Sequence, residues 1–501
     1  MTTGSRGDVV GAATAVAIAA DVAAGRRTAT DVLADSIARL SAEAAGLNAL
    51  VQPRGREAED DAAAIDARVS ARTGGVGPLG GVPLSVKECF AVRGLRTTLG
   101  IPSRISLVDG DDADLVTRLK LAGAVVVGKA NVPQAMYVHE TANPVWGRTN
   151  HPLDPRRNPG GSSGGDAALV AAGVVPLALG NDLAGSLRQP AHACGIAAIM
   201  PRGTILGTGG AFDTLPDLEV VRPRAGFLAR SVADLSLACD AVGVPGGGSV
   251  ASGRVTRVGW WDAAGPIPAS PAVLRALAMA VTAIDRAGIE TVRLDGGMAD
   301  EAAWLHLALL AADGGRQVSR LLGSDWPMRG VRRLLWIARL PRRWRGVVAA
   351  VARLAGSGVE ADALMRIGPC DTAAFAALVA ARVSLRARFT ALVAGCDCVL
   401  APVSALPAMR HGHAARLILA AAPCLPANLF DLPAGAVPVT RVASDEARSR
   451  PWSFDPVLQA AAATDRGSEG LPVGVQVIGC PGRDEATVLE VMRLIEAGTP
   501  A

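Results

Sequence analysis

The sequence predicts a protein of the α/β class. The strand-like segment LSVKECF at 84–90 is followed by the helix-like segment DDADLVTRLKLAG at 111–123, and then by AVVVGK at 124–129. AVVVGK is a continuous run of mostly β-branched residues, which is typical of a buried strand. The order strand, helix, strand indicates an α/β sheet. The chain has 501 residues, of which 50% are hydrophobic, so it can bury a large core and is not a disordered or fibrous protein.

The remaining elements follow in chain order. Residues 1–72 alternate Ala- and Leu-rich helical patterns with charged faces, and we expect a group of amino-terminal helices there. The two densest Gly/Ser loops are NPGGSSGG at 158–165 and GNDLAGS at 180–186. Further buried strands are expected in VGWWDAAG and CDCVLAPVS. We find no internal repeat and no linker that would divide the chain, so we expect one domain over 1–501.

Charge and hydropathy exclude several classes of function. The net charge is only +4, from 50 basic and 46 acidic residues, so nothing indicates a nucleic-acid-binding protein. The apolar run at 9–20 lies between Asp8 and Asp21, which argues against a secretory signal. No apolar run approaches the roughly 18 residues of a membrane-spanning helix. We therefore expect a cytoplasmic protein, and the eight scattered cysteines fit a reducing compartment.

Only three of the 50 basic residues are lysines, namely Lys87, Lys120 and Lys129. An amine can lose its proton near neutral pH, whereas a guanidinium stays charged. Each lysine is therefore a candidate for proton transfer. Lys120 lies in a helical pattern and is expected to be a surface charge, and Lys129 is expected to tie down a loop near the site.

The Gly/Ser loops and the cysteines fit three other chemistries poorly. A phosphate-binding loop needs Lys and Ser or Thr after its glycines, but Asp166 follows here. GSSGG fits the G-x-S-x-G pattern of α/β-hydrolases with Ser163 as nucleophile, yet no downstream His stands in a recognisable context. The Cys-x-Cys at 396–398 and the His-x-His at 411–413 have zinc-ligand spacing. Because CDCVLAP alternates as a strand does, we expect no metal site.

Five longer motifs resemble the amidase signature family. They are GGVPLSVKE, AGAVVVGKANVPQ, NPGGSSGG, GNDLAGSLRQPA and GLPVGVQVIG, and they span most of the chain. The resemblance implies a mixed central β-sheet surrounded by helices, with the signature core at 80–230. It also implies a triad of Ser186 as nucleophile, Ser162 after a cis peptide bond as bridging serine, and Lys87 as base. The implied reaction is amide hydrolysis through an acyl-enzyme, without a cofactor.

Elementary chemistry supports these roles. A serine hydroxyl is a weak nucleophile and needs an adjacent base. Lys87 can be that base only when it is neutral, and its apolar flanks predict a desolvated site that lowers its pKa. Ser162 can relay the proton because a hydroxyl both donates and accepts. The backbone N–H groups expected to bind the oxyanion are those of Leu183, Ala184, Gly185 and Ser186.

The second Gly/Ser loop departs from the family pattern at two positions. Asn181 stands where the family has Thr, and Ala184 stands where it has Gly. The Cβ of Ala184 disfavours a positive φ, so activity would suffer if the oxyanion loop needed one there. Asp182 and Arg188 match the family and are expected to hold the loop through charge-assisted hydrogen bonds.

Within the family, SVKECF, NVPQAM and NLFDLPAGAVPVT look most similar to the fatty acid amide hydrolases. The segment 326–354 contains three tryptophans and eight arginines, and Pro341 is expected to split it into two short helices. Apolar faces that carry Trp between Arg residues favour a helical cap at about 325–355 that lies in a membrane interface. A solvated basic face or a groove for a partner is the alternative.

The resemblance implies a small-molecule amide substrate with an apolar or fatty acyl group, and Met136, Ser163 and Asp182 are predicted to contact it. A short-chain or aryl amidase, or the amidotransferase subunit that makes ammonia from glutamine, is an alternative within the family. The departures at Asn181 and Ala184 leave a catalytically weak acyl-amide-binding protein as an alternative of another class. A homodimer is left open.

Overall fold

The computed structural model describes residues 12–42, 46–72, 75–203, 205–244, 254–448 and 450–499. Its centre is a mixed sheet of eleven strands in the order β1-β3-β2-β6-β8-β7-β12-β13-β11-β9-β10. These strands are β1 (Leu50–Pro53), β2 (Pro83–Lys87), β3 (Val125–Ala130), β6 (Leu177–Asp182), β7 (Ala197–Met200), β8 (Arg224–Ala229), β9 (Arg257–Trp260), β10 (Glu290–Arg293), β11 (Cys398–Pro402), β12 (Ala434–Arg441) and β13 (Pro472–Gly479). Two further strands, β4 (Ala142–Asn143) and β5 (Gly147–Arg148), form a separate ribbon. The predicted α/β class with a mixed central sheet is confirmed.

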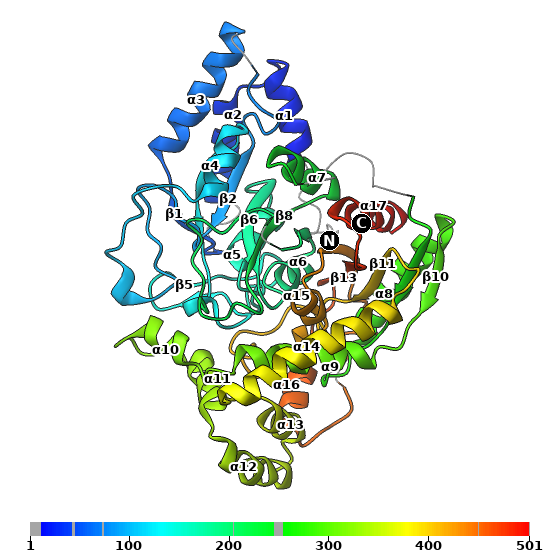
Figure 1. Cartoon of the computed structure of the whole chain (residues 1–501). Coiled ribbons are helices and arrows are strands. Elements are labelled where there is room, and N and C mark those ends of the chain that lie inside the picture. Colours follow the sequence, from blue (N-terminus) through cyan, green and yellow to red (C-terminus); the bar gives the residue numbers. More distant parts are fainter. Residues whose placement is uncertain are drawn as a thin grey trace, which may run out of the picture.

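Helices surround this sheet. They are α1 (Ala15–Ala23), α2 (Ala29–Ala42), α3 (Arg56–Ala71), α4 (Asp114–Leu121), α5 (Gly164–Ala171), α6 (Arg188–Cys194), α7 (Val232–Ala241), α8 (Pro271–Arg286), α9 (Gly297–Leu310), α10 (Arg316–Leu322), α11 (Arg329–Arg339), α12 (Arg342–Leu354), α13 (Gly358–Arg366), α14 (Thr372–Leu392), α15 (Leu425–Phe430), α16 (Pro456–Asp465) and α17 (Glu485–Gly498). Three short 3₁₀ helices are η1 (Pro102–Arg104), η2 (Gln134–Met136) and η3 (Ile418–Cys424). In Figure 1 the amino-terminal helices α1–α4 lie at one end of the molecule, and α10–α13 lie at the other.

The first predicted strand–helix–strand unit forms as expected. β2 pairs in parallel with β3, and α4 makes the connection between them. β2 also pairs in parallel with β6 on its other side. Because parallel strands end at the same edge of a sheet, Lys87 at the end of β2 and Asp182 at the end of β6 lie at one edge. Ligands of α/β proteins bind at such carboxyl ends, so this edge is where a site is expected.

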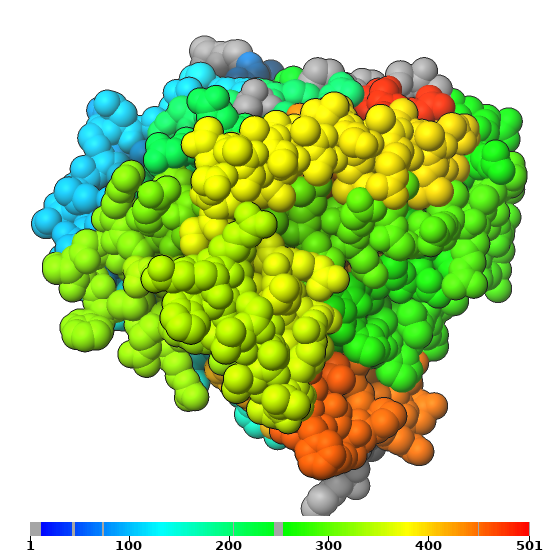
Figure 2. All heavy atoms as spheres, turned by 60° about the horizontal axis from the view of Figure 1, so that its bottom comes forward, coloured from blue at the N-terminus to red at the C-terminus, as the bar shows by residue number. Residues whose placement is uncertain are grey.

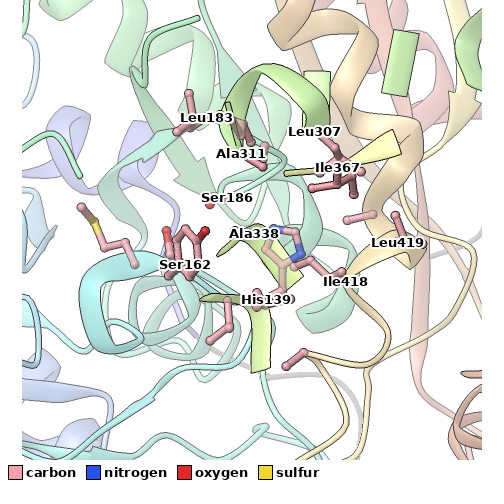
Figure 3. Close-up of a pocket in the computed structure, with 18 of the residues that line it drawn as sticks. His139, Ser162, Leu183, Ser186, Leu307, Ala311, Ala338, Ile367, Ile418 and Leu419 are labelled. Atoms are coloured by element: carbon pink, nitrogen blue, oxygen red, sulfur yellow. The ribbon is translucent and has the colours of Figure 1, made fainter. Parts of the chain in front are cut away.

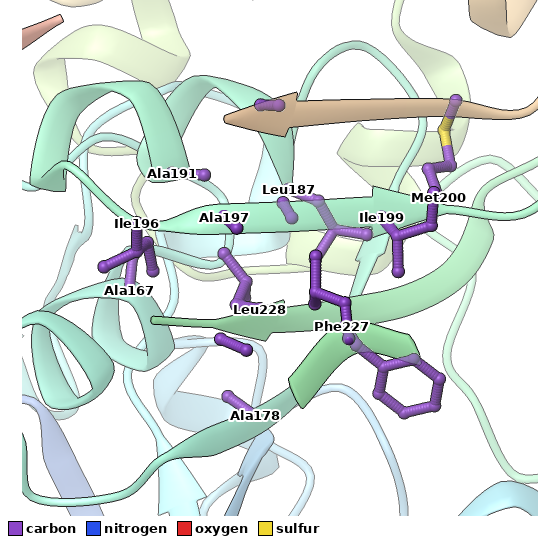
Figure 4. Packing of buried hydrophobic residues seen from close by; sticks show 14 of the residues in the cluster. Ala167, Ala178, Leu187, Ala191, Ile196, Ala197, Ile199, Met200, Phe227 and Leu228 are labelled. Atoms are coloured by element: carbon purple, nitrogen blue, oxygen red, sulfur yellow. The ribbon is translucent and has the colours of Figure 1, made fainter. Parts of the chain in front are cut away.

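The core is dense where β7 and β8 pack against the small residues of α5 and α6. Ile199, Phe227 and Leu228 are completely buried, and so is Leu187, the residue before α6, whose side chain lies over Gly180 and Gly226 (Figure 4). A Cβ at Gly226 would lie 2.2 Å from the carbonyl oxygen of Ile199, so only glycine lets the two strands approach this closely. This packing fixes α6, whose amino-terminal end carries the second Gly/Ser loop.

Pro341 divides the basic segment into two helices, as predicted. α11 ends at Arg339 and α12 begins at Arg342. Pro lacks a backbone N–H and cannot continue a helix, which explains the break. Among the helices of the described ranges, none has the length and apolarity that crossing a membrane requires.

Candidate active site

Lys87 is completely buried at the end of β2 and is the centre of a short hydrogen-bond network. Its Nζ lies 2.7 Å from Ser162 Oγ, 2.6 Å from Asn181 Oδ1 and 3.3 Å from the Asn181 carbonyl oxygen. Burial lowers the pKa of Lys87, and the nearby thiol of Cys89 and carboxyl of Asp166 act in the opposite direction. The predicted direction of this shift is confirmed, because the strand leaves the amine no water.

The two Gly/Ser loops bring Ser162 and Ser186 to one cavity. The Gly161–Ser162 peptide bond is cis, as the resemblance implied. The next residue ties the loops together, since the N–H of Ser163 donates to the carbonyl oxygen of Ser186 at 3.1 Å. Ser162 and Ser186 both line the cavity (Figure 3), and Lys87 lies behind Ser162. The structure therefore brings both serines to one cavity and Lys87 into contact with Ser162, and their catalytic roles stay a prediction.

Asp182 and Arg188 hold the loop after β6. Both side chains are fully buried, and Arg188 donates from Nε and Nη2 to the two carboxylate oxygens at 3.1 Å each. The same carboxylate accepts from the N–H of Gly185 at 2.7 Å and from the N–H of Leu187 at 3.1 Å. Despite burial, the Arg188 guanidinium and these N–H groups hold the pKa of Asp182 well below its usual range. The expected charge-assisted bonds are confirmed.

The predicted roles of three site residues are wrong in this structure. Asp182 and Ser163 are completely buried and do not line the cavity, because Asp182 faces Arg188 and Ser163 points to the Asn181 carbonyl oxygen. Neither can contact a substrate there. Gly185 also fails as an oxyanion donor, since its N–H is bonded to Asp182.

The rest of the predicted set does reach the cavity. Leu183, Ala184 and Ser186 line it, and so does Met136. Positive φ falls on Gly185 at +95°, whereas Ala184 has no positive φ. The alanine therefore imposes no strain on the loop, and the expected cost of this departure does not arise.

The cavity that the two serines line is mostly apolar. Ligand sites of this kind combine apolar walls with a few polar groups that orient the ligand. Its apolar walls come from α9, α11, α13 and η3 and include Leu307, Leu310, Leu334, Ile337, Ala338, Ala363, Ile418 and Leu419 (Figure 3). The charged lining residues are Asp213, Arg333, Glu360 and Arg416. Such walls suit an apolar group better than a polar one.

Sequence reasoning missed two histidines at the site, because neither lies in a recognisable motif. His139 lines the cavity, and burial lowers its pKa to about 4, so its imidazole is neutral near pH 7. His306 on α9 is buried behind Leu183, and burial lowers its pKa to about 3. Neither ring nitrogen of His306 makes a hydrogen bond of good geometry among the described residues. Only the three-dimensional packing reveals them.

The other lysines behave as expected. Lys129 donates to Asp109 at 2.6 Å, to Thr97 at 2.7 Å and to the Arg96 carbonyl at 2.9 Å, so it ties down the loop after β2. Lys120 pairs with Asp112 at 2.6 Å near the surface. In the part of the chain that the structure describes, no three His, Cys, Asp or Glu side chains come together as metal ligands.

Comparisons with known proteins agree with this geometry. A family model described as Amidase matches residues 31–488. The chain is 33% identical over 451 residues to fatty-acid amide hydrolase 1 of Sus scrofa, covering 84% of this chain and 76% of the relative. It is 29% identical over 508 residues to a glutamyl-tRNA(Gln) amidotransferase subunit of Anaeromyxobacter dehalogenans, covering 95% and 94%. A solved fatty acid amide hydrolase shares the fold, with a TM-score of 0.82 at 21% identity over 97% of this chain and 85% of that chain.

Proposed function

Because the chain belongs to the amidase family and is a hydrolase of amide C–N bonds, we propose that it cleaves long-chain acyl amides through Ser186, Ser162 and Lys87. The observation that carries the proposal is one cavity with the two serines at its wall and mostly apolar side chains around them. Lys87, the proposed base, touches Ser162 at 2.7 Å.

In the first half of the reaction, Ser186 Oγ attacks the amide carbon while its proton passes to Ser162 and the Ser162 proton passes to neutral Lys87. The oxyanion is stabilised by backbone N–H groups of Leu183, Ala184 and Ser186, which line the cavity. When the tetrahedral intermediate collapses, the C–N bond breaks. The leaving nitrogen takes a proton from Ser162, which is reprotonated by Lys87.

In the second half, water replaces the amine. It attacks the acyl-enzyme carbonyl and gives its proton to Lys87 through Ser162. The ester bond to Ser186 breaks, the serine oxygen regains a proton by the same path, and a carboxylic acid leaves. Each half begins with neutral Lys87, a state that burial favours because it lowers the pKa of the amine.

The acyl preference rests on the cavity walls. α11 contributes Leu334, Ile337 and Ala338 to the cavity. The same helix exposes Trp336, which is 56% accessible, on its outer face. A long acyl chain would therefore run beneath α11, and we propose that α11 and α12 form the cap at about 325–355.

We also propose that this cap contacts membranes peripherally. Trp344, Val347, Val351 and Leu354 are exposed on α12. Arginines lie among them, as in helices that rest in an anionic membrane interface. Figure 2 shows this yellow-green segment at the front of the molecule, with the orange segment around 452–454 against it. That orange segment adds the exposed pair Trp452 and Phe454, with Phe454 packed beside Gly356 at the end of α12.

The test is ammonia release from a series of primary amides, from acetamide to oleamide, with Ser186→Ala as the inactive control. Turnover that rises with chain length and disappears in the variant supports the proposal. A preference for short or aromatic amides would keep the mechanism and reject the fatty acyl assignment. Hydrolysis of glutamine instead would favour the amidotransferase alternative. An active Ser186→Ala variant would reject the triad.

An alkyl fluorophosphonate distinguishes the enzyme from an acyl-amide-binding protein. The reagent forms a covalent bond only with an activated serine. We expect labelling of the wild type and none of Ser186→Ala. A wild-type protein that binds oleamide but stays unlabelled would be a binding protein.

A further inference from the structure

We propose that Asn181 is a positioning residue that restricts proton exchange by Lys87 to Ser162. This inference rests on the proposed function, because it concerns the base of that triad. Two of the three hydrogen bonds of Lys87 Nζ go to oxygens of Asn181, at 2.6 Å and 3.3 Å, and the third joins it to Ser162 at 2.7 Å. Lys87, Ser162 and Asn181 are all buried.

The number of N–H groups and lone pairs on the Lys87 amine decides which of these contacts can donate and which can accept a proton. A neutral amine has two N–H donors and one lone pair, and an oxygen of an amide can only accept. When both N–H groups donate to Asn181, the lone pair faces the hydroxyl of Ser162. When Lys87 is protonated, the third N–H points along the same line and can return the proton. Asn181 therefore keeps the amine in the orientation for relay in both protonation states.

The sheet register explains why Asn181 reaches Lys87. β2 and β6 pair in parallel with Val86 beside Leu179, so the end of β2 lies next to Asn181. Asn181 occupies the position where the family pattern has Thr. A hydroxyl can also donate, and it could then occupy the lone pair of Lys87 in competition with Ser162. The carboxamide oxygen of Asn181 cannot compete in this way.

The other titratable groups near Lys87 make no hydrogen bond to its Nζ among the described residues. They are Cys89 after its own strand, Asp166 on α5, Asp182 at the end of β6 and His139 in the segment after η2. Asp166 accepts from Ser85 at 2.8 Å, and Asp182 pairs with Arg188. Among the described residues, Ser162 and Asn181 make the hydrogen bonds to Nζ. Asn181 is therefore the residue to vary.

The experiment measures the rate of Ser186 labelling by an alkyl fluorophosphonate between pH 5 and pH 10, which requires no knowledge of the natural substrate. Asn181→Asp keeps the shape and the acceptor but adds a negative charge beside Nζ. An opposite charge at this distance raises a pKa by about one to three units. We expect the acid limb of the profile to move to higher pH by about that amount. Asn181→Leu keeps the volume and removes the side-chain acceptor, and we expect the plateau rate to fall about 100-fold.

A matched exchange controls for the added charge. Asn150 donates to the Gly46 carbonyl, away from Lys87, so Asn150→Asp should leave the acid limb in place. The inference is overturned if the acid limb of the pH–rate profile does not move in Asn181→Asp. It is also overturned if the plateau labelling rate of Asn181→Leu stays within twofold of wild type. If Asn181→Leu does not fold, the profile of the isosteric Asn181→Asp decides alone.

Failure of the proposed function has a different signature. Lys87→Met labelled at the wild-type rate, or a wild type that is not labelled at all, rejects the triad and the inference together. An inactive Lys87→Met combined with wild-type behaviour of both Asn181 variants rejects the inference alone. A purely structural role for Asn181 would lower the melting temperature without moving the acid limb of Asn181→Asp.

Discussion

Gly185 is the residue of the oxyanion loop where a side chain is least tolerable. Its φ is +95°, and a Cβ there would lie 3.0 Å from the Cβ of Cys424. Gly185→Ala must therefore shift the loop and the cavity-facing N–H groups beside it. Loss of one oxyanion donor lowers kcat by about 100-fold or more. We expect a fall of that size in kcat for a short amide, measured by ammonia release, with little change in KM.

The neighbouring alanine provides the matched control. Ala184 has no positive φ, so Ala184→Gly restores the family residue without relieving any strain. We expect its kcat to stay within about threefold of wild type, since only backbone freedom increases. An equal loss in both variants would contradict the assignment of the strained position to Gly185.

The buried pair of Asp182 and Arg188 sets the stability of the same loop. Both side chains are inaccessible to water. Asp182→Asn leaves the guanidinium as an unpaired buried charge, which costs about 3–5 kcal/mol. We expect urea unfolding to show a loss of this size. Asp111→Asn is the comparison, because Arg93 and Asp111 are 71% and 86% exposed and such pairs contribute less than about 1 kcal/mol. Similar losses in both variants would refute the argument.

At this scale, motifs predicted more than physics alone could. The resemblance named Lys87, Ser162 and Ser186, and the structure brings them to one place. The resemblance could not show that the N–H of Gly185 donates to Asp182, because that hydrogen bond depends on the loop conformation. His306 comes from a helix far along the chain, and a single histidine on an apolar helix carries no signal in the sequence.

At the scale of elements, α11 is both a wall of the cavity and part of its cover. Ala338 lines the cavity and is buried on this helix. Ala338→Phe should fill space that a long acyl chain needs. We expect kcat/KM for oleamide to fall at least tenfold relative to that for acetamide. The loss of about 1.4 kcal/mol of binding energy between the acyl chain and the cavity wall is enough for a tenfold decrease.

Overpacking can also destabilise a protein, so the readout is the ratio of the two substrates. Ala64 is exposed on α3, at the other end of the molecule, so Ala64→Phe is the control and should leave the ratio unchanged (Figure 1). A uniform loss for both amides in Ala338→Phe would show that the acyl chain does not pass beneath α11.

The outer faces of α11 and α12 predict binding to anionic vesicles. Trp336 and Trp344 are 56% and 51% exposed, and basic residues surround them. Burying a large apolar side chain contributes about 1.5–3 kcal/mol. We expect the double variant Trp336→Ser, Trp344→Ser to bind phosphatidylserine vesicles at least tenfold more weakly in a sedimentation assay. Acetamide turnover in solution should not change.

Leu121→Ser is the control for that assay. Leu121 is 78% exposed at the end of α4, away from α11 and α12 (Figure 1). Its loss should leave vesicle binding as it is. Wild-type binding that does not differ between anionic and neutral vesicles, or does not exist, would reject the membrane contact and leave the cavity argument intact.

Elements with a strong local signal were predictable. The β-branched run Val125–Val127 forms a buried strand, and Pro341 separates two helices, because both effects act within a few residues. The inward face of α11 also follows a local pattern, since its buried residues Val331, Leu335 and Ala338 recur at helical spacing. The sequence does not show, however, that this face lines a cavity. α9 and α13 line the same cavity, and this arrangement of distant helices is not specified by any local pattern.

At the scale of the whole molecule, the order of the strands in the sheet is the feature that the sequence predicts least. β6 pairs with β2, and β12 pairs with β7, so several neighbours in the sheet are far apart in the chain. No local pattern specifies such an order, which depends on how all the strands bury their apolar faces together. The site exists because this order sets β2 beside β6.

The same global burial makes stability depend on pH. Burial lowers the pKa of His139 and His151 to about 4 and that of His306 to about 3, each below the ordinary value of about 6.5. Between these values the unfolded chain binds more protons, so stability rises with pH. Asp166 acts in the opposite sense, because burial raises its pKa to about 7 and the folded state then holds the extra proton. The contributions of the histidines and of Asp166 to the pH dependence of stability must therefore be separated with a variant.

His306→Leu isolates one of them without removing a well-formed hydrogen bond, since neither ring nitrogen makes one among the described residues. In the wild type, His306 should cost about 2 kcal/mol of stability when the pH falls from 7 to 5, because protonation then favours the unfolded chain. The variant lacks this contribution, and Asp166 affects both proteins equally. We expect urea titrations at the two pH values to show the stability gap between variant and wild type changing by about 2 kcal/mol in favour of the variant at pH 5. A gap that is the same at both pH values would mean that His306 is protonated with equal ease in the folded and unfolded states, and that its burial is not maintained in solution.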